Sequence, residues 1–192
     1  MAMSRETPGR AMAGRRDVVR WLLAAGLAAA AAPAAAGLRL TRFRGIGARF
    51  LWLRAGAEEH HVAFRDRSGA LSEAGLSRLC WAFRDRHAGD VAIWMDPRLF
   101  DLLAAIQTEA TLLADRPLRI ELVSGFRTAR RNLTIEGAAP ASQHIRGRAA
   151  DFALAGLDPR ETARIADRLG APGLGRYARF THVDVGPGPR RW

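Results

Sequence analysis

Two short stretches of the sequence carry residues that could bind a metal ion. Residues 142–151 read Ser-Gln-His-Ile-Arg-Gly-Arg-Ala-Ala-Asp and contain His144 and Asp151, and residues 180–186 read Phe-Thr-His-Val-Asp-Val-Gly and contain His182. Catalytic zinc sites combine three protein ligands of these types with a fourth position for water. A metal held in this way turns water into a nucleophile and polarises a carbonyl group. One interpretation is therefore metal-assisted hydrolysis.

The residues around these side chains predict two buried strands. Residues 149–154 and 180–185 are rich in apolar side chains, so Asp151 enters an apolar element. A buried carboxylate without a partner costs free energy, and a cation would remove that cost. The alternative is that Asp151 pairs with Arg146 or Arg148 and that the two histidines are ordinary core residues. The spacing alone leaves both interpretations open.

The other segments alternate between strand and helix patterns. Strands are predicted at residues 38–44, 49–53, 61–65, 118–123, 149–154 and 180–185. Helices are predicted at residues 72–86, 96–113, 128–133 and 158–168. Residues 170–175 are predicted to form a turn. We find no internal repeat and no interdomain linker. The fold class is α+β, with helices packed on a mostly antiparallel sheet.

The charge of the chain is large but carries little functional information. The 192 residues include 30 arginines, no lysine and 19 acidic residues, for a net charge of +11. The arginines are scattered among acids, as in the stretches 65–67 and 84–86, and form no basic stripe with interleaved aromatics. We therefore expect no nucleic-acid partner, although a salt-sensitive affinity for DNA would support the opposite hypothesis. The excess charge would attract other polyanions, including an anionic cell-wall polymer.

Residues 1–36 have the pattern of an export signal. Arg15 and Arg16 precede an apolar run that starts at Trp21, and the segment ends in small residues up to Ala36. Paired arginines before such a run resemble a twin-arginine signal, which predicts a periplasmic protein with its folded domain at 37–192. Removing the segment would leave a charge near +8. The alternative is an uncleaved membrane anchor, but the run of about 16 residues is shorter than the roughly 20 that a span needs.

Four further residues of reactive types receive structural interpretations. Cys80 lies in an apolar helical stretch, so we expect a small core residue and not a nucleophile. His60 and His61 follow two glutamates in a hairpin region and are predicted at the surface. His87 is predicted at a helix end, where its charge suits the helix dipole.

Taken together, the motifs resemble a known family. The string Ser-x-His-x-x-Gly-x-Ala-x-Asp, followed later by a histidine in a strand, resembles the zinc D,D-peptidases of the M15 type, which share a fold with the zinc-containing amino-terminal domain of hedgehog proteins. The closer resemblance is to the exported murein endopeptidase branch grouped as DUF882, the YcbK-like proteins. The matching segments are residues 84–87, 96–99, 124–127, Asn132, 142–151, 173–177, 180–186 and 191–192.

The resemblance implies roles for four residues. It implies that His144, Asp151 and His182 hold zinc. It also implies that Arg127, in the Ser-Gly-Phe-Arg turn, stabilises the oxyanion that develops on the substrate carbonyl. The alternative for this arginine is a structural pairing with Glu121 or with a backbone carbonyl.

The general base departs from the family pattern. Several M15 branches place Glu or His three residues before the last histidine ligand, where this chain has Arg179, which cannot accept a proton. Asp184 is the remaining candidate, because residues two apart on a strand point to the same face and His182 is its neighbour. It could accept a proton or orient a ligand, and both roles stay open. Tyr177, the sole tyrosine, is predicted to fill the core; the alternative is that it donates a hydrogen bond to an intermediate.

The implied function is a zinc-dependent murein peptidase that cuts amide bonds in the peptide cross-links of peptidoglycan. D,D- or L,D-endopeptidase and carboxypeptidase activities all fit the motifs. The alternative is a non-catalytic peptidoglycan-binding protein on the same fold, which the arginine at position 179 favours.

Overall fold

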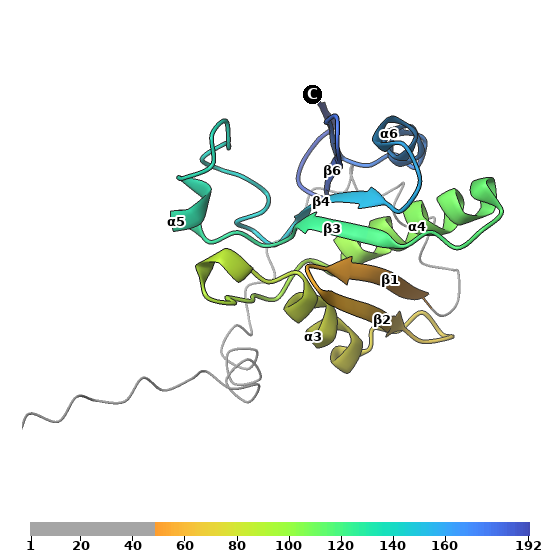
Figure 1. Ribbon diagram of the computed structural model, residues 1–192. Coiled ribbons are helices and arrows are strands. Elements are labelled where there is room, and N and C mark those ends of the chain that lie inside the picture. The colour runs from red at the N-terminus through yellow and green to blue at the C-terminus, as the bar shows by residue number, and fades with distance from the viewer. Residues whose placement is uncertain (1–48) are drawn as a thin grey trace, which may run out of the picture. The chain divides into compact units, whose positions relative to one another are not determined.

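The structure is a computed structural model that describes residues 49–192 (Figure 1). The predicted export signal at 1–36 and the predicted strand at 38–44 lie outside these residues. Within the described part of the chain, every helix is too short or too polar to cross a lipid bilayer.

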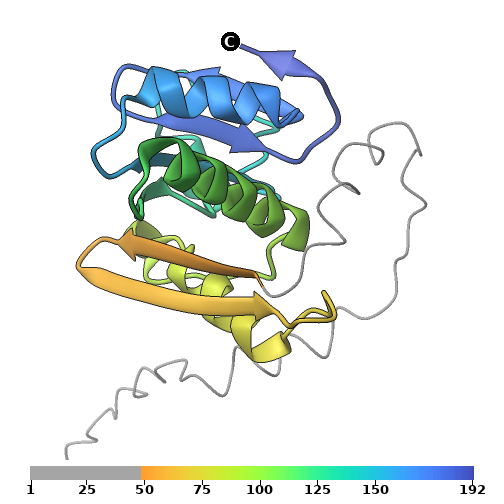
Figure 2. The same ribbon diagram turned by 90° about the vertical axis from the view of Figure 1, so that its right-hand side faces the viewer.

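The described residues form one mixed sheet of seven strands. In chain order the strands are β1 (Arg49–Ala55), β2 (Glu58–Arg65), β3 (Ile120–Ser124), β4 (Ala149–Leu154), β5 (Gly173–Arg176), β6 (Thr181–Asp184) and β7 (Arg190–Arg191). Their order across the sheet is β2-β1-β3-β4-β6-β5-β7, so β2 and β7 lie at opposite edges (Figure 2). β1 pairs with β3 and β5 with β7 in parallel, and the other four pairings are antiparallel. The prediction of a mostly antiparallel sheet is confirmed.

Three longer helices start at side-chain caps that are visible in the sequence. The helices are α3 (Glu73–Ala82), α4 (Pro97–Ala114) and α6 (Pro159–Arg168); a short helix α5 (Ala129–Asn132) and a 3-10 turn η2 (Arg86–Ala88) complete the set. The Ser72 hydroxyl and the Asp96 and Asp158 carboxylates accept backbone N–H groups of the first helical turns. Such caps satisfy donors that a helix start leaves unpaired.

The helices and the sheet share one apolar core. The Phe100 ring of α4 lies 6.2 Å from the Phe64 ring and 5.2 Å from the Phe83 ring, both in edge-on geometry. Cys80 is buried in the same core, where its sulfur accepts the Met95 backbone N–H. Burial raises the pKa of this thiol to about 11. The prediction that Cys80 is a core residue is therefore confirmed.

Some predicted elements are wrong. The helix predicted at 72–86 ends at Ala82, and His87 lies in the separate turn η2. Residues 173–175, predicted as part of the turn 170–175, belong to strand β5, which hydrogen-bonds with strands on both sides. The His60 side chain is only 15% exposed, so its surface assignment is wrong, whereas His61 is exposed as predicted.

Candidate metal centre

Strands β4 and β6 bring Asp151 and His182 face to face. The two residues are direct cross-strand partners in the antiparallel β4–β6 pairing, and Ser124 of β3 is the partner of Asp151 on its other side. Side chains of directly opposed residues project from the same face of a sheet. The prediction that two buried strands carry these residues is confirmed, and the two strands are neighbours in the sheet.

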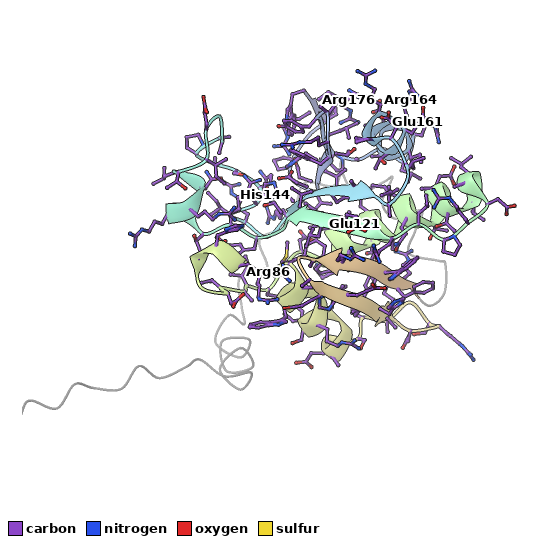
Figure 3. The ribbon with its side chains drawn as sticks, in the orientation of Figure 1. Arg86, Glu121, His144, Glu161, Arg164 and Arg176 are labelled. Carbon is purple, nitrogen blue, oxygen red and sulfur yellow. The ribbon has the colours of Figure 1, made fainter. Side chains whose placement is uncertain are left out.

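His144 reaches the same point from the loop that leads into β4, which Figure 3 shows beside the start of that strand. The chain turns sharply after His144, at Gly147, whose φ of +63° is strained for residues with a side chain. The Nδ1 atom of His144 lies 2.7 Å from the Gly125 carbonyl oxygen. Since a carbonyl can only accept, Nδ1 carries the proton and the lone pair sits on Nε2.

Three atoms that could bind a metal ion, one each from His144, Asp151 and His182, lie close together among buried side chains. The Nε2 atom of His144 is 3.2 Å from Asp151 Oδ1 and 3.2 Å from His182 Nδ1, and the latter two atoms are 2.7 Å apart. The opposite nitrogen of His182, Nε2, faces the Asp184 carboxylate at 3.4 Å. His144 therefore turns its lone pair toward the cluster, and His182 has a carboxylate beside each of its ring nitrogens. This arrangement fits a metal ion, and the cluster could hold one.

The ionisation of the cluster points the same way. Burial raises the pKa of Asp151, but hydrogen bonds and charge interactions with His144 and His182 outweigh it, so the net pKa is below the usual range. Burial lowers the pKa of His182, but its bonds to Asp151 and Asp184 raise it above the ordinary value. The site therefore keeps a carboxylate anion and favours positive charge beside it.

Arg127 borders the cluster on the β3 side. Its Nη2 donates to Asp151 Oδ2 at 2.5 Å and lies 3.3 Å from His144 Nε2, while its Nε donates to the Ser124 hydroxyl at 2.9 Å. The side chain is only 12% exposed. Arg127 is the guanidinium that pairs with Asp151, so the pairing considered for Arg146 or Arg148 is wrong.

The alternative pairing of Arg127 with Glu121 is also wrong. Glu121, which Figure 3 labels on β3, accepts two hydrogen bonds from Arg119 at 2.7 and 2.9 Å. Its carboxylate is thus occupied by another arginine.

Asp85 fixes the backbone immediately after Arg127. Its buried carboxylate accepts the Thr128 N–H at 2.9 Å, the Thr128 hydroxyl at 3.2 Å and Arg131 Nη1 at 3.1 Å. Burial raises the pKa of Asp85, yet these bonds and the charge of Arg131 lower it below the ordinary value. An ionised Asp85 therefore ties the turn that carries Arg127 to the segment after α3.

The cluster lines the wall of a cleft of about 320 Å³. The cleft is lined by Arg127, Ile135, Glu136, Gly137, Ala138, Ala139, Ala141, Ser142, Gln143, His144, Asp151, Tyr177, Phe180, His182, Asp184, Arg190 and Trp192. Tyr177 is 43% exposed here and its hydroxyl accepts the Trp192 indole N–H at 2.9 Å, so the predicted core role is wrong. Arg190 and Trp192 were not predicted to contact the site, although a terminal Arg-Arg-Trp sequence was visible.

A family model described as peptidoglycan L,D-endopeptidase MepK matches residues 46–192. The chain belongs to this family. It is 37% identical over 127 residues to the probable peptidoglycan L,D-endopeptidase MepK of Haemophilus influenzae, a match that covers 63% of this chain and 66% of that protein. It is 34% identical over 141 residues to the peptidoglycan L,D-endopeptidase MepK of Escherichia coli K12, which covers 70% and 74% of the two chains.

Membership in the MepK family supports the resemblance to M15-type murein endopeptidases. The twin-arginine signal, the DUF882 branch and the hedgehog-like fold stay predictions.

Replacing Asp85 tests whether this buried carboxylate holds the Arg127 turn. We expect Asp85→Ala to lower the free energy of unfolding by about 1.5–3 kcal/mol at pH 7, because charged hydrogen bonds are lost. Since folding lowers this pKa, its contribution is complete above the unfolded pKa of about 3.9 and is lost as the pH falls through the folded pKa. Urea unfolding at pH 7 and below pH 4 measures both effects. Arg130→Ala, an exposed change on α5 next to Arg131, is the control; an equal loss there would contradict the role of Asp85.

Proposed function

We propose that the protein is a zinc-dependent peptidase that hydrolyses amide bonds in the peptide cross-links of peptidoglycan. The observation that carries the proposal is the convergence of two imidazole nitrogens and a carboxylate oxygen beside Arg127 in a cleft. The names of the relatives support the bond class, since one is named a peptidoglycan L,D-endopeptidase and the other a probable one.

The donor set of the cluster suits zinc. His144 Nε2, Asp151 Oδ1 and His182 Nδ1 would be the three protein ligands. Zinc bound there would lower the pKa of water and polarise the scissile carbonyl.

Arg127 would stabilise the negative charge that develops on the carbonyl oxygen. Two of its nitrogens, Nε and Nη2, are held by Ser124 and Asp151, which fixes the plane of the guanidinium. Within residues 49–192, Nη1 donates to no other group and remains available to a substrate. A preorganised donor of this kind requires little rearrangement when charge develops.

Arg127→Lys tests this role. Lysine keeps the charge but cannot present a planar fork to Ser124, Asp151 and the substrate at once. We expect kcat on a muropeptide substrate to fall about 10²- to 10³-fold with a much smaller change in KM. Steady-state kinetics of zinc-loaded protein measure the split, and Arg130→Lys serves as the control. A variant with the wild-type kcat would remove Arg127 from the mechanism.

The decisive experiment for the reaction is cleavage of defined muropeptides followed by mass spectrometry. We expect zinc-loaded protein to cut a cross-link and the His144→Ala variant to leave it intact, because the variant lacks one ligand. His87→Ala, which changes an exposed histidine outside the cleft, should cut like the wild type. The masses of the products also identify the bond and separate endopeptidase from carboxypeptidase activity.

Two results of that experiment would contradict the proposal. Cleavage by His144→Ala would show that the cluster is not the catalytic centre. Zinc-loaded wild type that leaves every muropeptide intact but binds sacculi, together with normal binding by His182→Ala, would support the non-catalytic alternative. That alternative draws on Arg179, which is exposed and does not line the cleft.

We propose further that Asp184 acts through His182. Its carboxylate faces the Nε2 atom of His182, on the side of the ring opposite to the cluster, and also accepts the Gly186 N–H at 2.8 Å and the Arg190 guanidinium. A carboxylate with these contacts fixes the tautomer and orientation of a metal ligand. The geometry therefore favours ligand orientation over proton acceptance.

Asp184→Asn separates the two roles. The amide keeps the size of the side chain but removes the negative charge that faces the imidazole N–H. If Asp184 orients His182, zinc affinity should fall about 10- to 100-fold, as measured by competition with a chelator. Unchanged zinc affinity with a kcat loss of about 10²- to 10⁴-fold would instead make Asp184 the proton acceptor.

A peptidoglycan substrate would require the working protein to lie outside the cytoplasmic membrane. We propose that residues 1–36 direct this export through the twin-arginine pathway.

A further inference from the structure

We propose that the last residues of the described chain are a support for His182, in which Arg190 and Trp192 are positioning residues for the metal ligand. The inference rests on the proposed metal site but concerns residues that do not bind the metal. Both residues line the cleft. Arg190 contacts Asp184, which faces His182, and Trp192 contacts the His182 ring itself.

Arg190 compensates the charge of Asp184. The Asp184 side chain is only 1% exposed, and a carboxylate so deeply buried is costly unless a cation or several donors meet it. The Arg190 guanidinium and the Gly186 N–H both donate to Oδ1. The other oxygen, Oδ2, is thereby left to face the Nε2 atom of His182. Arg190 thus holds the Asp184 carboxylate in the position from which Oδ2 faces the imidazole.

Strand β5 is shaped to admit this carboxylate. Gly173 is the cross-strand partner of Asp184, and a Cβ atom at position 173 would lie 1.9 Å from Asp184 Oδ2. No side chain fits that space, so glycine is required there for steric reasons. The room for Asp184 is therefore a built feature of the sheet.

Trp192 covers the His182 ring from a second direction. The two ring centroids are 5.1 Å apart, and the indole N–H donates to the Tyr177 hydroxyl at 2.9 Å. The Trp192 backbone is also fixed, since its N–H donates to Leu174 and its carbonyl accepts the N–H of Arg176. A ring held at both its tip and its backbone restricts how far the imidazole can rotate.

A short parallel strand carries both positioning residues. β7 pairs with β5 through Gly173 opposite Arg190 and Leu174 opposite Arg191, and the Arg190 N–H donates to the Pro172 carbonyl at 2.8 Å. The neighbouring Arg191 donates to Asp167 at 2.9 Å and to the Pro172 carbonyl, and it does not line the cleft. Arg191 is therefore a matched control, with the same charge on the same strand but different partners.

The test measures the affinity for Zn²⁺ without substrate, by competition with a chromogenic chelator. We expect Arg190→Gln to bind Zn²⁺ about 10- to 100-fold more weakly than the wild type, Arg190→Lys to recover part of the loss, and Arg191→Gln to bind normally. Trp192→Ala should also weaken binding, whereas Trp192→Phe should retain most of it. Thermal unfolding of each variant in excess chelator reports the fold apart from the metal.

Wild-type Zn²⁺ affinity in Arg190→Gln, or an equal loss in Arg191→Gln, would overturn the role of Arg190. If Arg190→Gln does not fold, Arg190→Lys and Trp192→Ala carry the test, and wild-type affinity in both would overturn the support as a whole. Because no substrate is present, an inactive wild-type protein that binds Zn²⁺ contradicts the proposed peptidase and leaves this inference standing. A wild-type protein that binds no Zn²⁺ overturns both.

Discussion

The burial of one carboxylate governs the arrangement of the whole site. Asp151 lies in the middle of the sheet, where an isolated anion would cost several kcal/mol. Its two oxygens are shared between opposite partners: Oδ1 faces the two imidazoles, and Oδ2 takes the Arg127 guanidinium. The neighbouring strands must therefore deliver a histidine on one side, and the β3 turn must deliver an arginine on the other. The antiparallel pairings of β4 with β6 and β3 satisfy both needs.

The two imidazoles face this carboxylate through different nitrogen atoms, and a different contact orients each ring. His144 presents Nε2 because its Nδ1 is engaged by the Gly125 carbonyl, and His182 presents Nδ1 because its Nε2 faces Asp184. The tautomer of His144 is thus set outside the cluster, and the ring orientation of His182 is fixed by a carboxylate on each side. A backbone carbonyl needs no further support, whereas a buried carboxylate does. This difference explains why the His182 side of the site carries an additional layer, with Arg190 and Trp192, that the His144 side does not need.

The sequence predicts the pairing of Asp151 with His182 better than it predicts the residues that surround this pair. The apolar neighbours of Asp151 and His182 reveal two buried strands, and the spacing of His182 and Asp184 reveals a shared face. Nothing in the spacing tells which imidazole nitrogen faces Asp184, because that depends on the ring orientation. Strand β5 was missed because its glycines, which make room for other side chains, resemble those of a turn. The partner of Arg127 also depends on cross-strand register, which is not local in sequence.

Charge balance within the site gives the arginine-rich composition a limited but definite meaning. Elsewhere arginines pair with acids that do not line the cleft, such as Arg65 with Asp101, so the net charge says little about function. At the cluster, two carboxylates meet two guanidiniums, Arg127 on Asp151 and Arg190 on Asp184, and their formal charges cancel. With neutral imidazoles, a divalent cation would leave the site with two excess positive charges in a largely buried space. Under the proposed function, that surplus faces the oxygen of the scissile amide, where negative charge develops as hydrolysis proceeds.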